Sequence, residues 1–83
     1  MTVLITITAQ KQFNKIPLNE QKKIRKKFSI LEKDKFAGKK LERELEGYRS
    51  LRAWPYRIIY SIDENRKELT IKSILHRQGA YKN

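Results

Sequence analysis

The sequence contains no cysteine, three glycines, two prolines and a single histidine, His76. Without cysteine, the protein can form neither a disulfide framework nor a thiolate zinc site. Its longest apolar runs are a few residues long, far short of the roughly 20 that cross a bilayer. The first ten residues, MTVLITITAQ, lack the basic region and the small-residue cleavage site of a signal peptide. We therefore expect a cytoplasmic protein with no membrane partner.

Acidic residues are also scarce, because nine Asp and Glu stand against 20 Lys and Arg, for a net charge of +11. A surface of this kind favours polyanions such as RNA, DNA or an acidic protein. Residues 11–40 are rich in lysine, whereas six of the seven arginines lie from Arg43 onward. Lysine is a flexible point charge and arginine a planar fork. We interpret the first half as attracting the partner and the second half as positioning it.

The 83 residues, 39% of them hydrophobic, predict one domain spanning residues 1–83. Residues 2–7 alternate in the manner of a strand. Thr8 is the expected cap of a short helix in which Ala9, Phe13 and Ile16 share a face. A longer helix is expected to begin at residues 17–19 and to end near Gly38, a glycine suited to a helix C-cap.

The longer helix has a narrow apolar stripe and a basic outer face, which includes Lys22, Lys23, Lys26 and Lys27. After it, residues 39–47 form a charged connector, and residues 48–54, 56–63 and 68–75 have the pattern of strands. The predicted order is β-α-α-β-β-β. We expect an α+β fold in which two N-terminal helices pack on one face of a small, mostly antiparallel four-stranded sheet.

Strand side chains alternate between the two faces of a sheet, so the helices leave one face open. We call it the open face. The alternation predicts that it holds Arg52, Arg57, Lys72, Ile74 and His76. A bulge near Trp54-Pro55 would shift one strand by a residue, so Arg49 is an alternate to Arg52. Trp54 itself is interpreted as a packing residue at a strand end.

A basic sheet face of this composition suits a phosphodiester. Cleaving RNA through its own 2′-hydroxyl needs a proton acceptor, cations around the phosphorane and a donor to the leaving 5′-oxygen. Arginines supply the cations, and His76 can exchange a proton near neutral pH. Tyr81 can stack on a base. The carboxylates of the connector and of the turn after residue 63 show no metal-ligand pattern, so we expect no metal and no cofactor.

The stretches LEGYRSLRAWPYRIIYSIDE and LTIKSILHRQGAYK closely resemble the RelE/ParE toxin superfamily of type II toxin–antitoxin systems. The recurring pattern is a Leu-x-Gly connector, an Arg-containing strand, Tyr-Arg-Ile-Ile-Tyr, an Asp-containing turn and a terminal His-Arg-x-x-x-Tyr. Here the pattern includes Arg52, residues 56–60, Asp63, His76-Arg77 and Tyr81. The strand and the helical hairpin at the N-terminus match in order and length, so the resemblance covers essentially the whole chain.

The resemblance implies a RelE fold and a ribosome-dependent mRNA endonuclease that acts without metal in the A site of the ribosome. An acidic, partly disordered antitoxin would hold the toxin inactive and would bring it indirectly to operator DNA. The four lysines of the longer helix would serve in ribosome binding, and Arg49 and Lys72 would bind RNA.

Residue by residue, the resemblance assigns Arg52 and Arg57 to the scissile phosphate and to its transition state. Arg77 would hold the phosphate or protonate the leaving group, Tyr81 would orient the substrate by stacking, and His76 would act as an acid. The general base stays open. Some relatives use a lysine where this chain has Arg49 to Arg52, and a guanidinium is a poor base. The candidates are Lys39, His76 and Glu46.

Two other functions are compatible with the same fold, because a fold does not fix a function. One is a ParE-like toxin that inhibits DNA gyrase without cutting nucleic acid. The other is a non-catalytic toxin homologue that binds nucleic acid through its charge. The terminal His76-Arg77-x-x-x-Tyr81, together with Arg52 and Arg57, favours the endonuclease, because gyrase inhibition needs no phosphate site.

Overall fold

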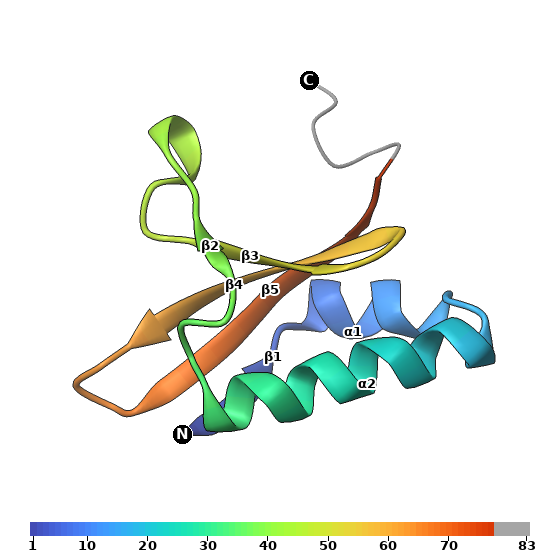
Figure 1. Ribbon diagram of the computed structural model, residues 1–83, viewed down its shortest axis with the longest axis horizontal. Coiled ribbons are helices and arrows are strands. Elements are labelled where there is room, and N and C mark those ends of the chain that lie inside the picture. Colours follow the sequence, from blue (N-terminus) through green and yellow to red (C-terminus); the bar gives the residue numbers. More distant parts are fainter. Residues whose placement is uncertain (78–83) are drawn as a thin grey trace.

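The computed structural model describes residues 1–77, which form a five-stranded sheet with two helices on one face (Figure 1). The elements are β1 (Thr2–Ile5), α1 (Ile7–Asn14), α2 (Leu18–Lys33), β2 (Lys39–Lys40), a 3-10 turn (Arg43–Leu45), β3 (Arg49–Ala53), β4 (Tyr56–Asp63) and β5 (Glu68–His76). The strand order is β1-β5-β4-β3-β2. β1 runs parallel to β5, and the other neighbouring strands are antiparallel. The α+β class is confirmed.

The fifth strand, β2, lies in the segment that the sequence predicts to be a connector. Lys39 pairs with Ser50, and Lys40 pairs with Arg49. Two adjacent lysines carry none of the β-branched or aromatic character that marks a strand. Their extended conformation therefore depends on the edge of β3, a long-range contact that no local pattern encodes.

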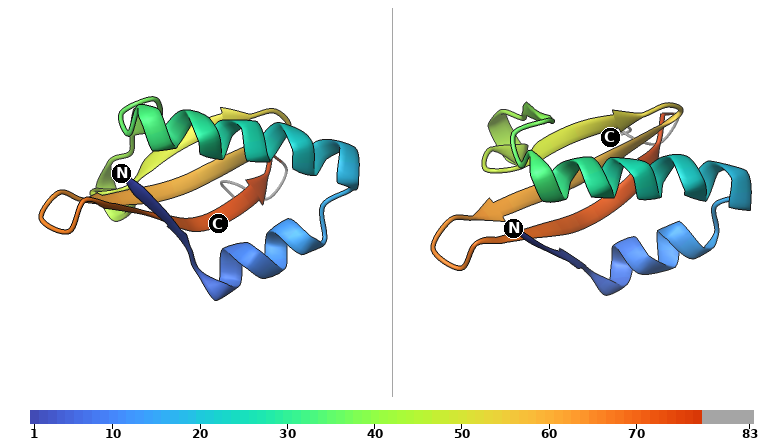
Figure 2. Two further views of the ribbon diagram at one scale, coloured as in Figure 1. Left: turned by 90° about the horizontal axis from the view of Figure 1, so that it is seen from below. Right: turned by 60° about the horizontal axis from the view of Figure 1, so that its bottom comes forward.

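The helices cover one face of the sheet (Figure 2). The apolar side chains of that face are buried between the sheet and the helices. α2 contributes Ile24 and Leu31, and α1 contributes Ala9 and Phe13, all of which are buried. From the sheet, the core includes Ile58, Tyr60, Leu69, Ile71 and Ile74. Within the described residues, no helix is long and apolar enough to cross a membrane.

At both ends of α1, side chains form hydrogen bonds with backbone groups that have no partner within the helix. The Oγ1 of Thr6 accepts a hydrogen bond from the N–H of Ala9 at 3.1 Å, so Thr6 is the N-cap and the expectation of Thr8 is wrong. At the other end, the buried Nε2 of Gln21 donates to the carbonyls of Phe13 and Ile16. Because helix-terminal groups have no partner in the helix, these bonds fix the α1–α2 hairpin.

Gly38 is not a helix cap, because α2 ends at Lys33 with Asp34 as its C-cap. The glycine lies where the chain passes close to the sheet. A Cβ there would stand 2.7 Å from the carbonyl oxygen of Ser50 and 2.8 Å from the hydroxyl of Tyr60. That hydroxyl accepts from the N–H of Gly38 and donates to the carbonyl of Lys35, each at 2.9 Å. A side chain at position 38 would break this bridge.

A β-bulge in β5 changes which residues share a face. Ile59 pairs with Ser73 and Tyr60 pairs with Ile71, so Lys72 is the extra residue. An extra residue reverses the alternation beyond it. Ile74 is consequently buried in the core at 4% exposure, and the expectation that it lies on the open face is wrong. The alternative of a bulge near Trp54-Pro55 does not apply, because β3 and β4 pair in continuous register and the bulge lies between β4 and β5.

Candidate functional site

The open face carries two arginines on adjacent strands. Arg52 on β3 pairs directly with Arg57 on β4, and Arg57 in turn pairs with Leu75 on β5. Residues that pair across strands lie on the same face. Arg52 is exposed and Arg57 is half-buried. The structure thus places Arg52 and Arg57 together, as the alternation of the strands predicts.

A third arginine joins them from the end of β5. The backbone N–H of Arg77 donates to the carbonyl of Pro55 at 2.7 Å, which holds the residue beside the β3–β4 turn. Its guanidinium carbon lies 5.4 Å from the centroid of the Trp54 ring. The guanidinium carbon of Arg52 lies 5.6 Å from the same centroid. Arg52, Arg57, Arg77 and Trp54 therefore form one group, which we call the arginine cluster.

Trp54 differs from its sequence-based interpretation as a packing residue. Its side chain is 51% exposed, and the core residue at this end of β3 is the buried Ala53. The aromatic–basic composition of residues 52–57 is the signal that could have identified it, because an indole attracts guanidinium groups.

His76 lies on the opposite face from the one expected. It pairs with Tyr56, and the two rings make an edge-to-face contact with centroids 5.3 Å apart and an interplanar angle of 85°. Tyr56 packs against the core beside the helices. The physical reason is the bulge at Lys72, which puts Leu75 opposite Arg57 and turns His76 away. Lys72 itself is exposed at the bulge.

Arg49 also turns away from the open face, because it pairs with Tyr60, a core residue. Its Nε and Nη2 donate to the carbonyl of Gly38 at 3.2 and 2.8 Å, and its guanidinium lies 5.1 Å from the ring centroid of Phe36. Arg49 is therefore no substitute for Arg52, and the structure assigns it to the segment after α2.

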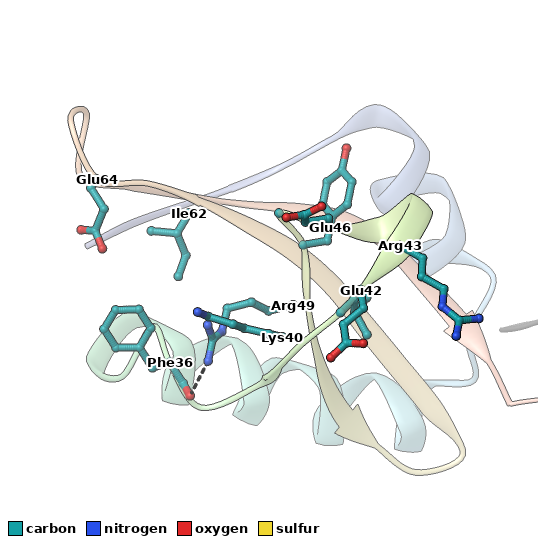
Figure 3. A pocket seen from close by; sticks show the side chains of 11 residues that line it. Phe36, Lys40, Glu42, Arg43, Glu46, Arg49, Ile62 and Glu64 are labelled. Atoms are coloured by element: carbon teal, nitrogen blue, oxygen red, sulfur yellow. Dashed lines mark hydrogen bonds between the residues drawn. The ribbon is translucent and has the colours of Figure 1, made fainter.

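Arg49 and Lys40 stand side by side in a hollow of about 650 Å³ at the edge of the sheet (Figure 3). The hollow is lined by both basic and acidic side chains, Glu46 among them, and by none of the three arginines of the cluster. Lys39 pairs with Ser50, which is two residues from Arg52 on the same face. Two of the general-base candidates, Lys39 and Glu46, lie outside β5. Lys39 is on the open face together with Arg52, whereas Glu46 lines the hollow and not the arginine cluster.

The four lysines belong to α2, which covers the face of the sheet opposite to the open face (Figure 2). Lys22, Lys23 and Lys26 are exposed, Lys27 is half-buried, and Lys23 forms an ion pair of 2.8 Å with Glu20.

Tyr81 lies outside the described residues. Among residues 1–77, no three His, Asp or Glu side chains are grouped so that they could hold a metal ion.

Comparisons with known proteins agree with this fold. The chain is similar to the toxin–antitoxin complex RelBE2 of Mycobacterium tuberculosis, with 33% identity, a TM-score of 0.85, and coverage of 92% of this chain and 96% of that chain. It is similar to the archaeal RelE–RelB complex of Pyrococcus horikoshii OT3, with 26% identity, a TM-score of 0.74, and coverage of 92% and 93%.

A YoeB/ParE toxin of Agrobacterium tumefaciens shares the fold at 18% identity and a TM-score of 0.79, over 92% of this chain and 98% of that one. Among curated proteins, no sequence matches at a significant level. The fold is thus that of the RelE/ParE toxin superfamily. Residues 3–81 match the family described as the ParE toxin of the type II toxin-antitoxin system, parDE. The chain belongs to this family.

Proposed function

We propose that this toxin is a ribosome-dependent mRNA endonuclease whose phosphate site is the arginine cluster. The observation that carries the proposal is the convergence of Arg52, Arg57 and Arg77 from three parts of the chain onto the open face. Three arginines on one face, two of them with their guanidinium groups against one exposed indole, suit a phosphodiester, because arginine binds phosphate oxygens with its planar fork.

The chemistry that we propose is attack of the substrate's own 2′-oxygen on the adjacent phosphorus. A bond forms between the 2′-oxygen and phosphorus, and the bond from phosphorus to the 5′-oxygen breaks, which leaves a 2′,3′-cyclic phosphate and a 5′-hydroxyl. The proton of the 2′-hydroxyl goes to a base, and the leaving 5′-oxygen takes up a proton. Arg52 and Arg57 would stabilise the charge of the phosphorane, with Arg77 beside them.

The proton acceptor that we propose is Lys39, because it shares the open face with the arginines. His76 is not placed among the groups that contact the phosphate, since its ring lies against Tyr56 on the other face. The stacking role of Tyr81 stays a prediction from the sequence.

The partners that we propose follow from charge and from the relatives. A net charge of +11 favours an acidic antitoxin, and the related RelBE2 and archaeal RelE–RelB structures are toxin–antitoxin complexes. Binding of mRNA and the ribosomal A site in the cytoplasm, and indirect association with operator DNA through the antitoxin, belong to the same proposal.

A second candidate function is inhibition of DNA gyrase, and it is favoured by the match to the ParE toxin family.

One experiment separates the endonuclease from the gyrase inhibitor. Purified toxin would be added to a translation system, and mRNA ends would be mapped by primer extension with and without ribosomes. Cuts that require ribosomes support the endonuclease. Intact mRNA together with unrelaxed or cleaved plasmid DNA in a gyrase assay would contradict the endonuclease and support the gyrase inhibitor. Intact mRNA and active gyrase would leave a non-catalytic toxin.

A further inference from the structure

The resemblance to RelE-like toxins gives no role to Trp54, yet this residue is the point where two arginines of the cluster meet. It is the only tryptophan in the chain and follows directly after β3. The guanidinium carbons of Arg52 and Arg77 lie 5.6 and 5.4 Å from its ring centroid, within the range of a cation–π contact. These two arginines come from sequence positions 25 residues apart.

Packing does not explain an indole at this position. Trp54 is 51% exposed and is not part of the apolar core, which at this end of the sheet is completed by Ala53 and Tyr56. Two guanidinium groups close to one another repel, and each long side chain loses rotamer freedom when it is held in place. The negative face of an indole offsets both costs, and among aromatic side chains tryptophan does so best.

We propose that Trp54 is a positioning residue that holds Arg52 and Arg77 together on the open face, ready for the scissile phosphate. The inference rests on the proposed endonuclease function, because it assigns the clustered guanidiniums to one phosphodiester. Trp54 acts through the two arginines and does not itself touch the reacting atoms. The backbone hydrogen bond from Arg77 to Pro55 holds the main chain of Arg77, and the contact with the indole holds its guanidinium group.

The first test measures the contact in the free protein. Trp54 would be excited at a wavelength that tyrosine does not absorb, and its fluorescence quenched with iodide and, separately, with caesium. Guanidinium groups at the ring attract the anion and repel the cation. We expect iodide to quench more strongly than caesium, and the ratio to fall in Arg52→Ala and again in Arg77→Ala. A ratio that neither substitution changes would overturn the proposal.

The second test measures cleavage of mRNA on ribosomes by the variants Trp54→Leu and Trp54→Phe. The leucine keeps an apolar side chain without a π face, and the phenylalanine restores a smaller one. Losing two exposed cation–π contacts predicts a fall of about tenfold in kcat for the leucine variant. The phenylalanine variant should recover most of it. KM should stay within about twofold, because a positioning residue acts on the transition state.

The chain supplies a matched control. Phe36 is 55% exposed and also lies beneath two cations, Lys35 at 5.2 Å and Arg49 at 5.1 Å, but outside the arginine cluster. Phe36→Leu should leave kcat unchanged. If wild-type protein cuts mRNA and Trp54→Leu cuts equally well, the role of Trp54 is overturned and the endonuclease stands. If wild-type protein does not cut, the proposed function fails, and the quenching ratio still decides whether the indole holds the arginines.

If both Trp54 variants lose activity equally, the π face is not what matters, and the inference is also overturned. If KM rises while kcat is unchanged, Trp54 binds the RNA directly rather than positioning the arginines, and the inference falls in favour of base stacking.

Discussion

The two faces of the sheet differ in what covers them and in which cation they carry. The helix-covered face is apolar, and beyond it the outer surface of α2 presents lysines. The open face presents Arg52 and Arg57 from paired strands, with Arg77 close by. From this difference we infer a separation of tasks in a small basic protein: one side builds the fold and is proposed to attract anions at long range, and the other is proposed to hold a few charges in place.

The largest expected effect tests the structural task of the helix side. Leu31 is fully buried on α2, so Leu31→Ala should lower the free energy of unfolding by about 2–5 kcal/mol. The adjacent Ile30 is 42% exposed, and Ile30→Ala should cost less than about 0.5 kcal/mol. Chemical denaturation followed by circular dichroism measures both. Equal losses would mean that α2 does not pack on the sheet through Leu31.

The next effect tests the proposed catalytic role of the open face. Arg57→Ala should remove about 2–4 kcal/mol of transition-state stabilisation, a loss of 30-fold to 1,000-fold in the rate of mRNA cleavage. Arg49→Ala is the matched control, because Arg49 hydrogen-bonds the carbonyl of Gly38 on the other face. Its rate should be near that of wild type, with reduced thermal stability. Full activity of the Arg57 variant would rule out the arginine cluster as the phosphate site.

A smaller effect is expected from the lysines of α2. Replacing Lys22, Lys23, Lys26 and Lys27 by glutamine should weaken ribosome binding and reduce the slope of log affinity against log salt by up to about three. The sites of cleavage should not change, since these lysines lie across the sheet from the cluster. Binding titrations at several salt concentrations measure the slope. A changed cleavage pattern would mean that the two faces do not act separately.

The smallest effect is expected at His76. His76→Gln should change the cleavage rate by no more than about twofold, because the ring contacts Tyr56 away from the proposed phosphate site. Single-turnover rates of the variant and of wild type give the comparison. A loss of tenfold or more would support His76 as the general acid and would mean that catalysis is not confined to the open face.

Much of the fold could be predicted from the sequence because the local patterns are strong. The strand predicted at 56–63 coincides with β4, and the long helix begins within residues 17–19 as expected. Arg52 and Arg57 were placed on one face by alternation alone, and their direct pairing bears this out. Alternation is reliable here because the two strands pair without interruption next to a tight turn.

The remaining features depend on contacts between distant residues. The bulge at Lys72 arises from how β4 and β5 pair, and it moved Ile74 into the core and His76 away from the arginines. The sequence predicts Gly38 as a helix cap, but in the structure a glycine is needed there because Tyr60 and Ser50 lie against it. The sequence indicates that Trp54 is a packing residue at a strand end, whereas in the structure Arg77 contacts it from the end of β5. None of these contacts leaves a periodic signal in the sequence.

The chemistry of the new RNA ends distinguishes attack by the 2′-oxygen from other routes of cleavage. Ribosome-bound mRNA would be cut with purified toxin, and the ends analysed by enzymes that distinguish 5′-hydroxyl from 5′-phosphate termini. Attack by the 2′-oxygen should leave a 5′-hydroxyl and a 2′,3′-cyclic phosphate, and no cut should occur where a 2′-deoxynucleotide precedes the scissile bond. Cleavage that leaves 5′-phosphate and 3′-hydroxyl ends, or that proceeds at the deoxynucleotide, would contradict it.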